Sequence, residues 1–233
     1  MDANALWATL ARTPSLDAPT LLAVEQKLRE TRPCAGTPGN PSCCAELLQL
    51  GIAELAELGL SRRAIEWLRS PSEALIAADL RAMERHSLQL LAAVSPQFPA
   101  LMAQQRGAPA VLWLRGRSTA LNRPQLAIVG TRNPSANGRR TAYEFAEYFT
   151  HGGLVITSGL ALGIDAAAHE GALAAGGPTI ADPRKAEAFE GRVLQPELHW
   201  GGDDRAVLGF RCTNSGMTLA VAVDHAIETA NAV

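Results

Sequence analysis

The chain has 233 residues, of which 47% are hydrophobic, so it can bury one core of ordinary domain size and a smaller one. It contains no run of the roughly 18 apolar residues that would cross a bilayer, and its N-terminus lacks a basic start followed by an apolar stretch. We therefore expect a cytoplasmic protein with no membrane partner. The formal net charge of −2 argues against a uniformly basic, nucleic-acid-binding coat.

The first third of the chain has the pattern of short helices interrupted by glycine and proline. Residues 32–42 contain three prolines and two glycines, which predicts a loop, and Ser72 is a suitable N-cap for the last helix. The predicted helices cover residues 21–28, 45–50, 52–58, 61–69 and 72–85. These features predict a small all-helical domain over residues 1–86.

The cysteines are spaced irregularly, and none stands near a histidine. This pattern supports neither a disulfide framework nor a zinc module, so we predict four free thiols and no metal. The four are Cys34, Cys43, Cys44 and Cys212.

From about residue 87 the pattern alternates between strands and helices. Apolar runs without polar alternation predict strands, and helical periodicity separates three of them, giving the order β-α-β-α-β. The predicted strands cover residues 88–94, 111–114, 124–129, 153–157 and 178–181, and the helices cover 138–150 and 165–175. The fold class expected for residues 87–233 is thus α/β, a Rossmann-like parallel sheet with helices on both faces.

Two glycine-containing loops follow successive predicted strands, at residues 130–138 and 158–165. In an open α/β sheet that edge binds ligands, and free amides at a helix N-terminus attract anions. Residues 107–181 carry six arginines against four acidic side chains, and Arg132 stands in the first loop. The loops therefore predict a phosphorylated ligand, although glycine and serine are also ordinary in such loops. Neither loop has a Walker A or dinucleotide-binding pattern, so we expect no ATP, NAD or other cofactor.

Asp165 and His169 are four residues apart on one predicted helical face. They could form an acid/base pair, but the sequence offers no third partner or nucleophile beside them. We favour a buried hydrogen bond that fixes the second loop, and expect no catalytic residues.

The residues in both loops resemble the DNA-processing (DprA/Smf) family. Residues 125–138 (QLAIVGTRNPSANG) are similar to its first hallmark, and residues 158–173 (SGLALGIDAAAHEGAL) to its second. Residues 98–101 and 110–116 resemble the family's extension before the Rossmann core. The predicted helical domain of residues 1–86 resembles the small sterile-alpha-motif-like or helical-hairpin domain that often precedes it. The resemblance covers about residues 1–181.

The resemblance implies a protein without turnover that binds single-stranded DNA entering a cell, protects it and helps load the RecA recombinase in natural transformation and recombination. It also implies dimers in the family, and whether this chain forms a homodimer is open. Arg132 would then pair with a phosphate, and Asp165 and His169 would brace the site. The other DNA or phosphate contacts would be Gly130, Thr131, Ser135, Gly138, Arg139, Ser158, Gly159 and Gly163.

Residues 182–233 depart from the family pattern. Its later motifs are absent, and the basic residue expected before Thr179 is replaced by Pro178. Two alternatives therefore stay open: an enzyme of a related Rossmann group that binds or processes nucleoside monophosphates, or an inert protein with an incomplete site. We interpret the polar residues His199, Asp203 and Asp204 as an exposed loop rather than a metal site.

Overall fold

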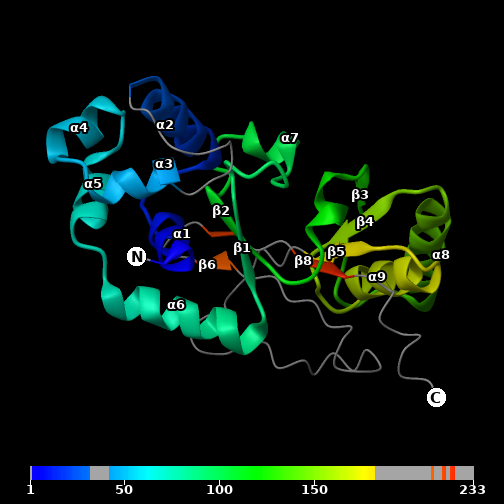
Figure 1. Ribbon diagram of the computed structural model, residues 1–233. Coiled ribbons are helices and arrows are strands. Elements are labelled where there is room, and N and C mark those ends of the chain that lie inside the picture. The colour runs from blue at the N-terminus through cyan, green and yellow to red at the C-terminus, as the bar shows by residue number, and fades with distance from the viewer. Residues whose placement is uncertain (1, 32–41, 182–210, 213–216, 219–220, 224–233) are drawn as a thin grey trace, which may run out of the picture. The chain divides into compact units, whose positions relative to one another are not determined.

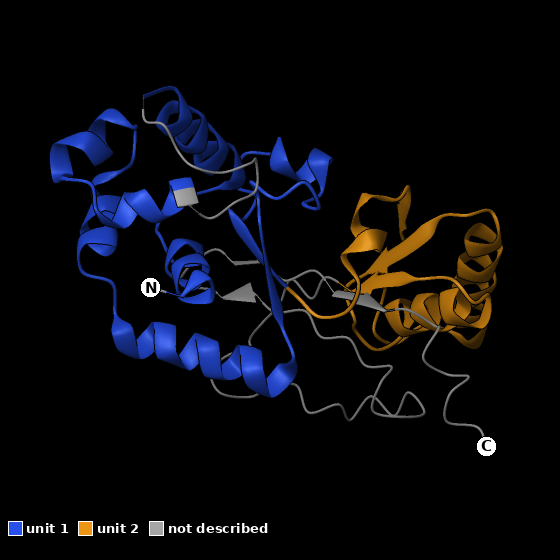
Figure 2. Ribbon diagram, viewed as in Figure 1, with its two compact units in different colours: residues 1–113, 212–218 blue, residues 114–211, 219–233 orange. Residues whose placement is uncertain are grey.

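The structure, a computed structural model, describes residues 2–31 and 42–181 together with short strands at 211–212, 217–218 and 221–223. The chain divides into two compact units, residues 1–113 with 212–218 and residues 114–211 with 219–233 (Figure 2). The first unit therefore extends 27 residues beyond His86 and includes most of the first strand pair. A domain boundary at residue 86 stays a prediction.

Helices make up most of the described part of unit 1. Its helices are α1 (Ala3–Ala11), α2 (Ala18–Thr31), α3 (Ser42–Ala45), α4 (Ile52–Glu57), α5 (Arg62–Arg69), α6 (Glu73–His86) and α7 (Ala100–Ala103), with a 3-10 turn η1 (Glu46–Leu48). Strand β1 (Gln89–Ala92) pairs with β2 (Val111–Leu114), and β6 (Arg211–Cys212) pairs with β7 (Met217–Thr218). The Ser72 hydroxyl accepts a hydrogen bond from the Leu75 N–H at the start of α6, which confirms the predicted N-cap.

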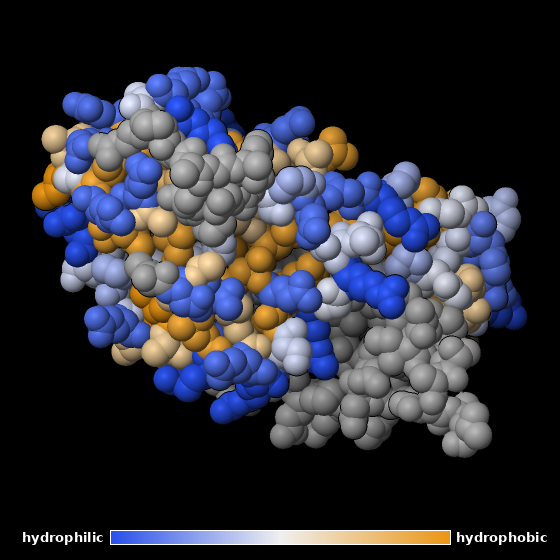
Figure 3. All heavy atoms as spheres, in the orientation of Figure 1, coloured by the Kyte–Doolittle hydropathy of each residue, from blue (hydrophilic) through white to orange (hydrophobic). Residues whose placement is uncertain are grey.

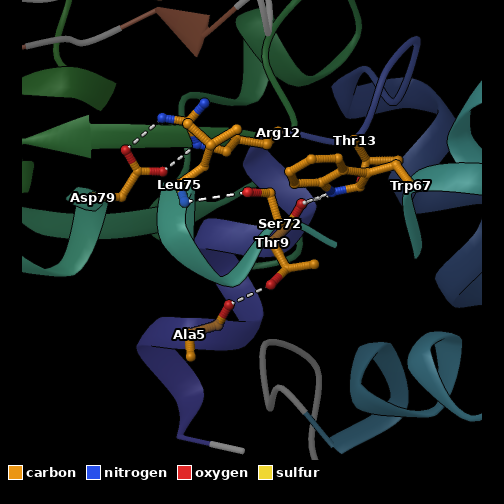
Figure 4. A network of polar contacts seen from close by, with 8 residues as sticks. All are labelled: Ala5, Thr9, Arg12, Thr13, Trp67, Ser72, Leu75 and Asp79. Carbon is orange, nitrogen blue, oxygen red and sulfur yellow. Dashed lines mark hydrogen bonds and ion pairs between the residues drawn. The ribbon is translucent and has the colours of Figure 1, made fainter. Parts of the chain in front are cut away.

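A buried polar network joins α1 to the later helices of unit 1 (Figure 4). The Arg12 guanidinium donates to both carboxylate oxygens of Asp79, which is only 4% exposed. The Trp67 indole N–H donates to the Thr9 carbonyl over 2.9 Å. These bonds satisfy polar groups that would otherwise be costly to bury, and so fix how α1 packs against α5 and α6.

The cysteines differ from the sequence prediction at one position. Cys43 is disulfide-bonded, so the prediction of four free thiols is wrong. Irregular spacing along the sequence does not reveal which sulfurs the fold brings together. Cys44 is a buried free thiol, and burial, with a smaller effect of Glu25, raises its pKa to about 12. It is therefore an unreactive core residue.

Unit 2 contains the predicted β-α-β-α-β order, which confirms the α/β fold class (Figure 1). The elements are η2 (Ser118–Asn122), β3 (Gln125–Ala127), α8 (Ala136–His151), β4 (Val155–Ser158), α9 (Ile164–Ala174) and β5 (Thr179–Ala181). Strands β3, β4 and β5 are parallel neighbours, with Gln125 opposite Val155 and Ile156 opposite Thr179. Strand β8 (Val221–Val223) joins β5 in antiparallel register, so part of the tail extends this sheet.

Helices α8 and α9 lie side by side and share one core with the sheet (Figure 1). Its buried members are Ala146, Ile156, Ala168 and Ala172, with Leu126, Ile128 and Phe149 packed against them. The alternate residues of β3, Gln125 and Ala127, are exposed. Cover by helices on both faces was predicted, but the exposure of Gln125 and Ala127 shows that the described elements cover only one face of β3.

Candidate nucleic-acid interface

The two predicted loops are in direct backbone contact. They follow β3 and β4, which are neighbouring parallel strands, so both emerge at the same edge of the sheet. The Ile164 N–H donates to the Thr131 carbonyl over 3.2 Å, and the Ser158 hydroxyl donates to the Ile128 carbonyl over 2.6 Å. The loops therefore form one continuous surface.

Two glycines permit this close approach. Gly163 has a φ of +90°, and a Cβ there would lie 2.4 Å from the Thr131 carbonyl oxygen and 2.6 Å from that of Arg132. A Cβ at Gly130 would lie 2.7 Å from the Ile164 side chain. Because backbone cannot rotate away as a side chain can, any larger residue at Gly163 would push the loops apart.

Asp165 ties the loops together at the start of α9. Its carboxylate is 6% exposed, accepting a hydrogen bond from the Gly130 N–H over 3.3 Å and from the Gly159 N–H over 3.1 Å. Gly130 and Gly159 were expected to contact the ligand, but their amides donate to the protein's own carboxylate. Both glycines therefore hold the loops together, and the missing side chain at Gly130 also leaves room for Ile164.

His169 is fixed one turn further along α9. It is 2% exposed, and its Nδ1 lies 2.8 Å from the hydroxyl of Thr179, which donates its proton to the Ile156 carbonyl. Nδ1 must therefore carry the proton that joins it to Thr179. Burial lowers the pKa of His169 to about 4, so the imidazole is neutral near pH 7.

The start of α8 is capped by Ser135, whose hydroxyl accepts a hydrogen bond from the Gly138 N–H over 3.1 Å. The Thr131 hydroxyl accepts a hydrogen bond from the Asn133 N–H over 3.2 Å. The remaining first-turn amides, of Ala136 and Asn137, have no acceptor within the helix and carry the positive end of its dipole. The first loop thus leads into an end of α8 that favours an anion.

The arginines of this edge differ in their contacts. Arg132 is exposed, and its guanidinium makes no hydrogen bond or ion pair with any residue that the structure describes. Arg139 is held by Glu170 of α9, and Arg140 bonds Asn137 and lies 3.7 Å from Glu144. The face of unit 2 drawn in Figure 3 is mostly hydrophilic.

The sequence did not identify Ile164 as the support of Gly130, Thr179 as the partner of His169, or Glu170 as the partner of Arg139. Each contact joins residues from different elements of unit 2. The only sequence signal for the pair was that Glu170, on the next predicted helix, has a charge opposite to that of Arg139.

No group of three or more histidine, cysteine or acidic side chains suited to a metal ion occurs within the described ranges. Residues 199–204, interpreted as an exposed loop, lie outside them. None of the helices described is long and apolar enough to cross a membrane.

The segment that contains both loops is similar to a family of known proteins. The family model of DNA recombination-mediator protein A matches residues 89–182, which include both loops. Protein Smf of Escherichia coli (strain K12) is 35% identical over 127 residues, which are 54% of this chain and 34% of that protein. This segment of the chain is similar to the DprA/Smf family.

Two proteins named DprA are also similar to this chain. DNA processing protein DprA of Bacillus subtilis (strain 168) is 35% identical over 102 residues, 43% of this chain and 34% of that protein. The X-ray structure of DprA from Streptococcus pneumoniae shares the fold, with a TM-score of 0.55 and 22% identity over 78% of this chain and 57% of that one. The chain spans about a third of the length of the curated relatives it matches.

Proposed function

We propose that this protein binds single-stranded DNA at the edge formed by the two loops. We further propose that it protects incoming DNA and assists the loading of RecA in natural transformation and recombination, in the cytoplasm. The family is one of recombination mediators, and its relatives are named DNA processing proteins. The observation that carries the proposal is the exposed guanidinium of Arg132, on a loop held rigid by the second loop.

The proposed contacts are to the sugar-phosphate backbone. Arg132 would supply a charged fork for phosphate oxygens, and the amides of Ala136 and Asn137 would supply neutral donors beside it. Thr131 and Ser135 would line this side, while Gly159 and Gly163 would form the opposite wall. Ser158, which was expected in that wall, is 3% exposed and bonded to the Ile128 carbonyl, so it would support the wall rather than touch DNA. Because none of these contacts reads a base edge, we expect little base preference and a steep dependence on salt.

We propose a binding role without turnover, since the polar residues beside the loops are engaged in structure. Both Asp165 oxygens accept backbone amides, and Glu170 holds Arg139. A general base near pH 7 should have a pKa in that range, whereas the pKa of His169 is lowered to about 4. Hydrolysis of nucleoside monophosphates by the purified protein would instead favour the enzymatic alternative.

The test is the affinity for a labelled oligo-dT, measured by fluorescence anisotropy at several salt concentrations. Arg132→Ala removes one charged hydrogen-bonding group, typically worth about 1.5–3 kcal/mol, so we expect affinity to fall about 10-fold to 100-fold. The slope of log affinity against log salt should decrease by about 0.7, the value for one phosphate on a single strand.

Arg63→Ala is the matched control. It removes the same charge from an exposed position on α5, in unit 1. Equal losses in the two variants would overturn the assignment of the site, and absence of binding by the unmodified protein at low salt would overturn the proposed function. The proposed RecA contact and homodimer are tested separately, by pull-down with purified RecA and by sedimentation.

A further inference from the structure

Arg139 and Glu170 form a two-pronged ion pair beside the loops. One guanidinium nitrogen, Nη2, lies 2.9 Å from each of the Glu170 carboxylate oxygens. The side chains are 56% and 36% exposed, so the pair lies at the surface rather than in the core of unit 2. Arg139 comes from α8 and Glu170 from α9.

The position of the pair brings it close to the proposed path of DNA. Arg139 is one turn beyond the Ser135 cap, since its N–H donates to the Ser135 carbonyl. Arg139 therefore closely follows Ala136 and Asn137, whose first-turn amides favour an anion.

A carboxylate and a phosphate are alternative ligands for the same guanidinium fork. Both offer anionic oxygens to its N–H groups, and one cannot bind fully while the other is in place. An exposed ion pair contributes little to stability, so its exchange for a phosphate has a low cost. Once displaced, the Glu170 carboxylate would remain near the DNA and repel it.

We propose that Glu170 is an internal competitor of DNA. It holds Arg139 in the free protein and yields it to a backbone phosphate on binding, so that Arg139 becomes a second guanidinium contact beside Arg132. This inference rests on the proposed function, and it makes Glu170 a residue that sets the affinity of the site from outside the contact surface.

The experiment measures oligo-dT affinity for Glu170→Gln, with Glu144→Gln as the control. Glu144 is also exposed and paired with an arginine of α8, so its replacement removes the same charge without releasing Arg139. We expect Glu170→Gln to bind about twofold to fivefold more tightly than the unmodified protein, the factor that corresponds to an exposed ion pair. Glu144→Gln should change affinity by less.

The double variant shows whether the gain passes through Arg139. In an Arg139→Ala background, Glu170→Gln should have no more effect than Glu144→Gln, because no guanidinium is left to release. Arg139→Ala should weaken binding more in the Glu170→Gln protein than in the unmodified one, and should lower the salt slope there by about 0.7. Thermal unfolding of each variant checks that the fold is kept.

The outcomes separate this inference from the function on which it rests. If the unmodified protein binds, Arg132→Ala weakens it and Glu170→Gln is no tighter than Glu144→Gln, only the exchange is overturned. The exchange alone is also overturned if Glu170→Gln increases the affinity for oligo-dT by the same factor in the Arg139→Ala protein. If the unmodified protein does not bind at low salt, both are overturned.

Discussion

The packing of α8 against α9 should fail when a single methyl group is added at Gly171. A Cβ at this position would lie 2.2 Å from the Tyr143 carbonyl oxygen and 3.1 Å from the Ala146 Cβ. Because the nearest atom belongs to helix backbone, it cannot rotate aside, and α9 must retreat by roughly 1 Å to restore van der Waals contact. That movement would also loosen the buried contacts of Ala168 and Ala172.

The magnitude follows from two opposing effects. Alanine is favoured over glycine within a helix by about 1 kcal/mol. Overpacking a core costs about 1–3 kcal/mol, and a clash with backbone belongs at the upper end. We therefore expect Gly171→Ala to lower the free energy of unfolding of unit 2 by about 2 kcal/mol, the difference between these two effects.

Gly138→Ala is the matched comparison on the neighbouring helix. A Cβ there would meet only the Ser135 hydroxyl at 3.3 Å and Pro134 at 3.9 Å, so this variant should be neutral or more stable by up to about 1 kcal/mol. Hydrogen exchange followed by mass spectrometry of peptides from α8 and α9 measures unit 2 by itself. Equal protection in the two variants would refute the close packing argued from Gly171.

Two further perturbations test the buried polar groups. Because the pKa of His169 is about 4 in the folded protein against 6.5 unfolded, its contribution to stability is present above pH 6.5 and is lost as the pH falls toward 4. Urea unfolding from pH 7 to 5 should show this loss, and His169→Asn should remove most of it; an unchanged pH dependence would contradict the assignment. Arg12→Met leaves the carboxylate of Asp79 buried without its cation and should cost about 3–5 kcal/mol, whereas Arg62→Met, which breaks an exposed pair, should cost at most about 0.5 kcal/mol. Similar shifts of the unfolding temperature for the two methionine variants would show that burial does not increase the contribution of the Arg12–Asp79 pair to stability.

The order of elements and the ends of helices could be predicted because they depend on neighbours in the sequence. Apolar runs and helical periodicity predicted the β-α-β-α-β order of unit 2. The Ser72 hydroxyl caps α6 by accepting a hydrogen bond from an N–H only three residues later in the sequence. The presence of Arg132 in a loop after a strand was visible in the same way. Each of these signals extends over a few residues, within the range of a strand or one helical turn.

The one-sided cover of β3 and the pairing of the loops were decided by tertiary structure. Asp165 accepts amides from positions 35 and 6 residues away, Arg139 meets Glu170 across 31 residues, and His169 meets Thr179 on the neighbouring strand. Whether a loop amide is free or an arginine is already paired depends on which strands and helices become neighbours. Local patterns predicted which residues surround the site. The packing of α9 against α8 and β4 determined that Arg139 is held by Glu170 while Arg132 is exposed, because charged groups find partners through space rather than along the chain.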